Sequence, residues 1–221
     1  MCNRKLFLKG LDRLGIKLEG KSVDNILLYC RELTKWNKRI NLIARNTPPD
    51  DILEKHFLDS LTLLSVIDLY GDKSPTLLDV GTGAGFPGLA LAAVKPKLQV
   101  TLVEPRQKRI SFLRHIIRTL QLANVTVIDD RLEHSNNLAG ENFSFITSRA
   151  VADADRFLAM IKDVSGPETT VIVMQATDGM EQWISGNRTE NWQLLGSQNF
   201  LLPFSGAPRL LSVVRKRQTD T

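Results

Sequence analysis

Residues 77–88 constrain the fold more than any other part of the chain, and they read LLDVGTGAGFPG. A short apolar run opens the segment, as expected for a strand buried in a parallel sheet. Four glycines then fall within eight residues, and a helical pattern follows at 87–94. Glycine permits positive φ and lets a ligand lie against bare backbone, and Pro87 suits the first turn of a helix. The segment therefore predicts a strand, a loop and a helix that together form a nucleotide site.

The type of nucleotide depends on where the pattern begins. Residues 83–88 match G-x-G-x-x-G, and Glu104 lies about twenty residues further on, as in dinucleotide-binding proteins. That fingerprint should begin where the strand ends, yet two residues intervene here. Read from Asp79, the pattern is D-x-G-x-G-x-G, which is similar to the S-adenosylmethionine (AdoMet) motif of Rossmann-like methyltransferases. We expect AdoMet as the cofactor, and a glycine-rich connection without a ligand is the plain alternative.

Length and composition exclude several classes of protein. The chain has 221 residues, of which 43% are hydrophobic, enough for one sizeable α/β domain with an appendage. No apolar run approaches the roughly 20 residues of a membrane helix, and no signal peptide opens the chain, so we expect a cytoplasmic protein. Cys2 and Cys30 lie far apart without a C-x-x-C motif, so we expect neither a disulfide nor zinc. The three histidines are scattered, and we expect no metal site.

The net charge of +5 is concentrated in two clusters of basic residues. One cluster lies on a predicted helix without acidic neighbours, and the other lies near residue 40. Apolar residues compete for the sheet side of that helix, so we expect its charged groups to reach solvent. The first cluster is Arg106, Lys108, Arg109, Arg114 and Arg118, and the second is Lys35, Lys38, Arg39 and Arg45. Contact with RNA phosphates and a simple solvated surface remain equally open.

The chain divides into a helical part and an alternating part. Residues 1–70 show helical periodicity and no glycine-rich loop, and Ser22 is predicted to cap one helix. We expect these residues to form a small N-terminal helical cap. Residues 71–221 alternate strand and helix, which is typical of a doubly wound α/β sheet. We expect them to form a Rossmann-like domain.

The predicted sheet is mostly parallel and has seven strands. The last two strands are separated only by a short turn at 205–208, so they should pair as an antiparallel hairpin. This arrangement looks like the sheet of class I AdoMet-dependent methyltransferases, whereas dehydrogenase sheets usually lack the hairpin. The predicted strands are 77–81, 99–103, 124–128, 143–148, 169–175, 192–202 and 209–216, and the predicted helices between them are 87–94, 107–121, 153–163 and 178–185.

Ligands of such sheets lie beyond the carboxyl ends of the strands. Glu104 ends the second predicted strand, where a carboxylate can accept both ribose hydroxyls. Leu132 and Glu133 follow the third strand, the usual position of contacts to adenine. Ser148 and Arg149 follow the fourth.

The end of the fourth strand also excludes some reactions. Methyltransferases that act on the amino groups of adenine or cytosine carry D/N-P-P-Y/F there, where this chain has TSRA. Methylation of cytosine C5 needs a thiolate, and both cysteines lie in the predicted cap. Methylation of guanine N7 needs neither that motif nor a thiolate, because the N7 lone pair is already nucleophilic. In-line positioning, worth about 7–11 kcal/mol, and exclusion of water could then suffice.

The chain resembles one family over most of its length: the bacterial 16S ribosomal RNA guanine-N7 methyltransferases, also called the glucose-inhibited division protein B family. The DVGTG loop alone is moderately specific, and its combination with the other motifs is strong. The matching motifs are WNK at 36–38 with NL at 41–42, HFLDS at 56–60, DVGTGAGFPG at 79–88, KR with FL at 108–113, RLE at 131–133 and SRA at 148–150.

The resemblance implies a cofactor, a partner and a set of site residues. The cofactor is AdoMet, and the target is a single guanine in 16S rRNA, either free or in a precursor of the small subunit. We expect a monomer without membrane or metal, and Arg149 as a candidate for positioning the reactants. The AdoMet-binding residues expected from the loop pattern and the resemblance together are Asp79, Gly81, Gly83, Gly85, Phe86, Glu104, Leu132, Glu133 and Arg149.

One departure from the family pattern concerns the substrate. The family often shows a Lys-Gly pair after the fifth strand, where this chain has Gln175 and Ala176. The departure concerns substrate recognition rather than reaction type. Two alternatives stay open: AdoMet-dependent methylation of another RNA or a small molecule, and an NAD-binding oxidoreductase or non-catalytic nucleotide-binding module.

Overall fold

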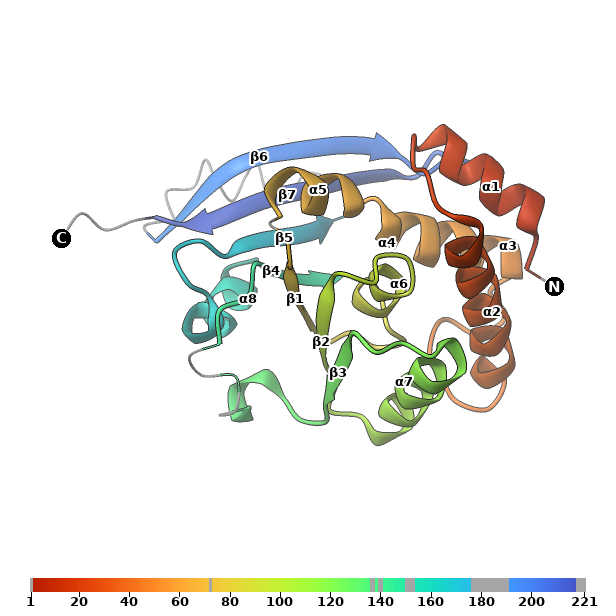
Figure 1. The fold of residues 1–221 in the computed structure, drawn as a ribbon, viewed down its shortest axis with the longest axis horizontal. Coiled ribbons are helices and arrows are strands. Elements are labelled where there is room, and N and C mark those ends of the chain that lie inside the picture. The colour runs from red at the N-terminus through yellow and green to blue at the C-terminus, as the bar shows by residue number, and fades with distance from the viewer. Residues whose placement is uncertain are drawn as a thin grey trace.

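The computed structural model describes residues 2–71, 73–135, 138, 141–149, 154–175 and 191–217, and its central feature is a seven-stranded sheet (Figure 1). The strand order is β3-β2-β1-β4-β5-β7-β6. Strands β1 to β5 are parallel, and β7 is antiparallel to both β5 and β6. This confirms the mostly parallel sheet with its terminal hairpin. The strands are β1 (Thr76–Val80), β2 (Gln99–Val103), β3 (Val125–Ile128), β4 (Phe145–Arg149), β5 (Thr170–Gln175), β6 (Trp192–Leu201) and β7 (Pro208–Lys216).

Helices precede the first strand. They are α1 (Arg4–Arg13), α2 (Gly20–Asn37), α3 (Pro49–Ile52), the π-helical η1 (Leu53–Leu58), α4 (Asp59–Leu61) and α5 (Leu64–Tyr70). The prediction that Ser22 caps a helix is wrong, because α2 begins two residues earlier with Glu19 at its N-cap position. The hydroxyl of Ser22 instead donates to the carbonyl of Val94 at 3.5 Å. None of the helices among the described residues combines the length and apolar character needed to cross a membrane.

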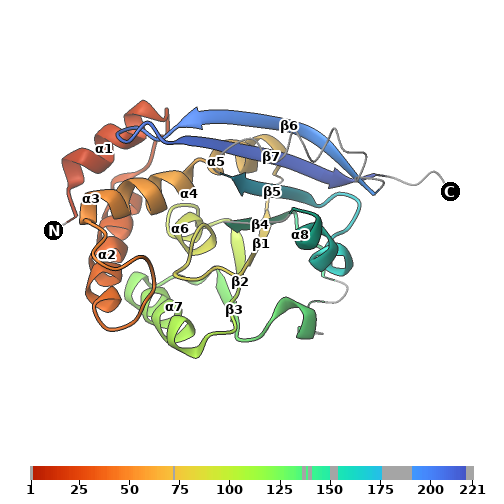
Figure 2. The same ribbon diagram turned by 180° about the vertical axis from the view of Figure 1, so that it is seen from behind.

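The remaining helices connect the parallel strands. They are α6 (Gly88–Ala92), α7 (Gln107–Leu120), α8 (Ala154–Met160) and two short 3-10 helices, η2 (Leu132–His134) and η4 (Lys162–Val164). The predicted helix at 178–185 lies outside the described residues. Helix α8 lies on the side of the sheet away from α2 and α7 (Figures 1 and 2).

Each face of the sheet has its own core. Leu77 belongs to a large buried cluster that also contains Phe7, Leu33 and Phe112, so the N-terminal helices share a core with the sheet. The next residue, Leu78, points to the other face and belongs to a smaller cluster with Phe157 of α8. Alternation along each strand therefore decides which side chains meet the N-terminal helices.

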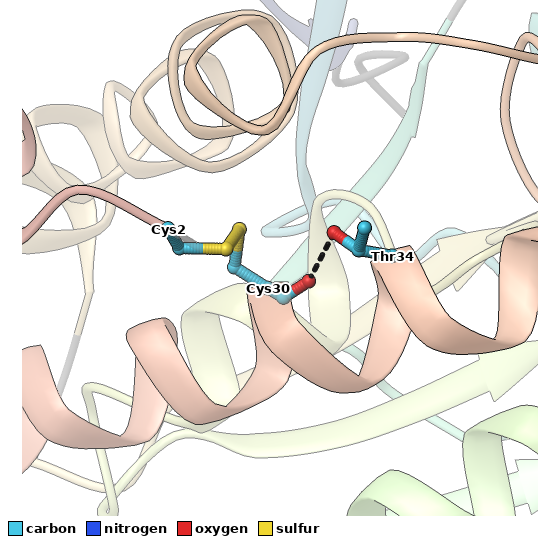
Figure 3. Close-up of a disulfide and its surroundings, with 3 residues drawn as sticks. All are labelled: Cys2, Cys30 and Thr34. Carbon is cyan, nitrogen blue, oxygen red and sulfur yellow. Dashed lines mark hydrogen bonds between the residues drawn. A yellow bond between two sulfur atoms is a disulfide. The ribbon is translucent and has the colours of Figure 1, made fainter.

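The expectation of unlinked cysteines is wrong, because Cys2 and Cys30 form a disulfide (Figure 3). Their Cα atoms are 6.4 Å apart although 28 positions separate them in sequence. The segment before α1 lies against α2 at this point, and the Thr34 hydroxyl donates to the Cys30 carbonyl at 2.8 Å one helical turn further on. The spacing of the two cysteines in the sequence does not reveal that these two segments lie side by side.

Candidate functional site

The glycine loop lies at the carboxyl end of β1. The backbone N–H of Gly81 donates to the carbonyl of Val103 at the end of β2, at 2.9 Å. Gly81, Gly83 and Gly85 have φ values of 70°, 63° and 93°, which side chains rarely tolerate. No atom lies within 4 Å of the position that a Cβ on Gly81 would take. The loop thus presents bare backbone to open space at Gly81.

The side chain of Asp79 accepts hydrogen bonds from two residues of this segment, Thr82 and Gly88. This side chain is fully buried, and Oδ2 accepts from the N–H of Gly88 at 2.8 Å and from the Thr82 hydroxyl at 2.5 Å. Oδ1 is buried without a hydrogen-bond partner in the described structure. Burial raises the pKa of Asp79 to about 6, against the opposing effect of the two hydrogen bonds. The carboxylate therefore shapes the loop.

Glu104 lies at the end of β2 and is only 2% exposed. Oε2 accepts from the N–H of Gly83 at 3.0 Å, and Oε1 accepts from the N–H of Arg106 at 2.9 Å. The guanidinium of Arg109 lies 3.4 Å from Oε2. The Arg109 side chain is 27% exposed, so it reaches solvent in part, and it also pairs with the buried carboxylate, which the sequence did not predict. Carboxylate oxygens can accept about four hydrogen bonds, so Glu104 keeps capacity for a ligand hydroxyl.

A pocket of about 420 Å³ opens at the carboxyl ends of β1, β2 and β4. It is lined by Val80, Gly81, Val103, Pro105, Arg131, Leu132, Glu133, Ser148, Arg156, Phe157 and Met160. Its size is that of a small-molecule site. It brings together three predicted residues, Gly81, Leu132 and Glu133. Sequence reasoning missed Phe157 and Met160 of α8, whose spacing of three residues is a weak signal for one apolar helix face.

A second group of side chains lies on the other side of the loop. The Phe86 ring is buried, and the His56 ring from η1 stacks on it with centroids 5.1 Å apart. The guanidinium of Arg149 lies 5.0 Å from the centre of the same ring and donates to Nδ1 of His56 at 2.8 Å. Ser148 and Arg149 point to opposite faces of β4, so Arg149 joins this group while Ser148 lines the pocket.

His56 is neutral in this environment. Burial lowers its pKa to about 3, and the positive charge of Arg149 acts in the same direction. Since Nδ1 accepts from Arg149, the proton of the neutral ring lies on Nε2. Burial also lowers the pKa of Arg149, while Asp59 and Asp79 raise it. The sequence offered no sign of this pairing, because 93 positions separate the two residues.

Helix α2 supports the loop from the side of the N-terminal helices. The buried Tyr29 hydroxyl donates to the carbonyl of Ala84 at 2.5 Å, and its ring stacks on Phe86 with centroids 5.7 Å apart. A Cβ on Gly85 would lie 2.1 Å from the Tyr29 oxygen. Gly85 is therefore required by packing as well as by its positive φ.

Comparison with known proteins identifies the family. The family model described as rRNA small subunit methyltransferase G, GidB, matches residues 22–211. The chain belongs to this family. Among curated members, ribosomal RNA small subunit methyltransferase G of Desulfotalea psychrophila is 42% identical over 211 residues, covering 94% of this chain and 95% of the relative. The protein of the same name from Geobacter sp. strain M21 is 33% identical and covers 96% of each chain.

Solved structures share the fold at low sequence identity. A SAM-dependent methyltransferase from Aquifex aeolicus has a TM-score of 0.52 and 21% identity, over 71% of this chain and 90% of that chain. An MtNAS mutant in complex with S-adenosylmethionine has a TM-score of 0.58 and 19% identity, over 90% of this chain and 77% of that chain. This GidB family member thus has the class I methyltransferase fold.

Proposed function

We propose that this protein transfers the methyl group of AdoMet to N7 of a guanine in 16S rRNA of the small ribosomal subunit. One observation carries the proposal: the glycine loop of a GidB family member faces a nucleotide-sized pocket with open space at Gly81. Family membership directs the activity to small-subunit rRNA, as the names of the relatives state. The choice of guanine N7 rests on the chemistry of the site.

The residues around the pocket fit AdoMet. The bare backbone at Gly81 admits a ligand at the loop, and Leu132 and Glu133 line the pocket beyond β3, where we place the adenine ring. We assign the ribose hydroxyls to Glu104, whose carboxylate retains unused acceptor positions. When bound, AdoMet supplies an electrophilic methyl group on its sulfonium sulfur. Asp79 acts indirectly, since its fully buried carboxylate holds Thr82 and Gly88 in place.

The side chains on the other side of the loop suit a reaction without a general base. The imidazole of His56, with a pKa of about 3, does not take up a proton at neutral pH. Guanine N7 requires no proton removal, because its lone pair is free to react. We infer that His56 and Arg149, held against the buried Phe86 ring, position the purine and exclude water from it. Positioning of this kind is worth about 7–11 kcal/mol of the barrier.

The basic surface of α7 and α2 is the proposed contact for the RNA backbone near the target. The two helices pack against each other, which brings the two predicted basic clusters onto neighbouring elements (Figure 1). Lys108 and Arg118 are exposed on α7, and Lys35 is exposed on α2. Arg114 contributes less, because its guanidinium lies 3.2 Å from the Asp129 carboxylate.

These assignments also suggest a role for each of the two parts of the chain. We infer that residues 1–70 serve as a helical cap, since η1 carries His56 to the site, and that residues 71–221 form the cofactor-binding domain. We further propose that the enzyme acts as a monomer in the cytoplasm and without a metal ion. Among the described residues, no three His, Cys, Asp or Glu side chains are grouped so that they could hold a metal.

Nucleotide mass mapping of 16S rRNA tests the proposed function. Small subunits from cells that lack this protein are incubated with the purified enzyme and AdoMet, and the rRNA is digested and mapped. We expect one new methyl group, located on N7 of a single guanine. The matched control is Gly206→Ala, a substitution in the β6–β7 turn at a residue that does not line the pocket, and this variant should methylate the same nucleotide. A methyl group on another atom or on another class of RNA contradicts the proposal.

A further inference from the structure

A large groove lies at the amino ends of the strands, opposite the pocket described above. Its volume is about 830 Å³, and Pro75, Lys97 and Asn124 are among its lining residues. Pro75 and Asn124 directly precede β1 and β3, and Lys97 lies two residues before β2. Strand β1 has five residues, which at about 3.3 Å each places the groove about 17 Å from the glycine loop. The groove is thus a separate surface at the amino ends of the strands, opposite the glycine loop.

Lysines dominate the charge of this groove. They come from three separate parts of the chain, and all but Lys95 are exposed. Among the described lining residues, Glu19 and Asp68 are acidic, and Asp68 pairs with Lys95. Within the described residues, the other lysines have no ion pair. The lysines of the groove are Lys17, Lys21, Lys73, Lys95 and Lys97.

Lysines gathered around one groove give it a positive potential, which attracts anions. The described lining residues include five positive and two negative side chains, a net charge of +3 among them. The N-terminus of α2 also opens beside the groove, and the side chain of its N-cap residue Glu19 makes no capping hydrogen bond there. A polyanion is therefore the complementary partner.

Side-chain amides pair with backbone carbonyls in the floor of the groove. The Asn124 amide donates to the carbonyls of Leu98 at 2.8 Å and Ala92 at 3.3 Å, and the Asn25 amide donates to the Ala93 carbonyl at 3.1 Å. These carbonyls at the end of α6 and before β2 are thereby satisfied. The lysines therefore surround a floor in which these three carbonyls already have hydrogen-bond partners.

We propose that this groove binds the phosphate backbone of a second segment of 16S rRNA, distant from the target guanine. The inference rests on the proposed function and adds a second RNA-binding surface to it. Lysine ammonium groups on flexible chains suit phosphates, and none of the described lining residues is aromatic, so base stacking is absent. A flat membrane surface would not enter a concavity, whereas a single RNA strand can.

Two matched triple variants test the groove. Lys21, Lys73 and Lys97 are replaced by Gln in one, and Lys5, Lys9 and Lys162, which are exposed elsewhere, are replaced by Gln in the other. Both lose three charges, so a general charge effect is the same in each. Binding of intact 16S rRNA and of a short RNA hairpin that contains the target guanine is measured across a series of KCl concentrations. Methyl transfer and AdoMet affinity are measured on the same preparations.

We expect the groove variant to show a flatter salt dependence with intact 16S rRNA. The log–log slope should fall by about 0.7–0.9 for each phosphate that the variant no longer neutralises, and affinity should fall about tenfold or more. The control variant should keep the parental slope, and both variants should bind the hairpin and AdoMet as the parent does. Equal slopes for the two variants, or an equal loss with the hairpin, would overturn the inference.

The outcomes for the groove and for the proposed function are distinguishable. A parent protein that binds 16S rRNA with a steep slope but transfers no methyl group refutes the function and leaves the groove result standing. A groove variant that binds naked 16S rRNA as the parent does, yet fails only on protein-containing subunits, assigns the groove to a protein partner and refutes the RNA assignment.

Discussion

The guanidinium of Arg149 donates to Nδ1 of His56 at 2.8 Å, which joins the end of β4 to the π-helical η1. Both groups lie against the buried ring of Phe86 in the glycine loop. Because the pKa of His56 is lowered to about 3, its ring stays neutral and can accept this hydrogen bond at any physiological pH. The pair is a fixed element of the site, and π-helical segments often occur at functional sites.

A double-mutant cycle tests whether the pair acts as a unit. Each of His56→Ala and Arg149→Ala should lower single-turnover methyl transfer about 10- to 100-fold, since a hydrogen bond to a charged group is worth about 1.5–3 kcal/mol. The double variant should lose little more than either single variant. AdoMet affinity, measured by calorimetry, should change far less than turnover, because neither residue lines the pocket. Independent, additive losses would show that the two side chains act separately.

Gly81 allows a controlled test of the cofactor pocket. Gly81 and Gly206 have similar φ values of 70° and 64°, and neither has an atom within 4 Å of the position that a Cβ would take. Replacement of either by Ala should cost about 1–3 kcal/mol of stability from backbone strain. Only Gly81→Ala places a methyl group at the pocket, so only this variant should lose AdoMet affinity, by about tenfold or more. An equal change in affinity for both variants would assign the effect to strain.

The sequence predicted the framework of the site better than its contacts. Hydrophobic runs and glycines placed β1 and β2 within one residue of their observed ends, since burial and positive φ are local requirements. The sequence did not show which distant segments lie side by side. The Cys2–Cys30 disulfide and the contact of His56 with Arg149 were therefore missed. These contacts depend on how the N-terminal helices pack against the sheet, which no local pattern encodes.

Glu104 presents two possible roles that a ligand analogue can separate. The carboxylate is expected to accept ribose hydroxyls, but it also accepts from the N–H of Gly83 and so shapes the loop. Glu104→Ala should weaken AdoMet binding by one to a few orders of magnitude, at about 1.4 kcal/mol per order. Removal of the 2′-hydroxyl from AdoMet should then matter less in the variant than in the parent. If the analogue loses the same affinity with both proteins, Glu104 only supports the loop.

Asp79 should make the stability of the protein depend on pH in an unusual direction. Burial raises its pKa from 3.8 to about 6, so the folded protein binds the proton more tightly than the unfolded chain does. The stabilising contribution of the protonated form is complete below the unfolded pKa near 4 and is lost as the pH rises through about 6. A shift of about two pKa units corresponds to about 3 kcal/mol.

Comparison with Asp79→Asn isolates this contribution from all other titrating groups. The free energy of unfolding of both proteins is measured by urea titration at several values between pH 4 and pH 7. Relative to the variant, the parent should lose up to about 3 kcal/mol of stability as the pH rises across this range. A carboxylate satisfied in the folded protein would give the opposite slope. A difference between the two proteins that does not vary with pH would show that Asp79 keeps its ordinary pKa despite complete burial.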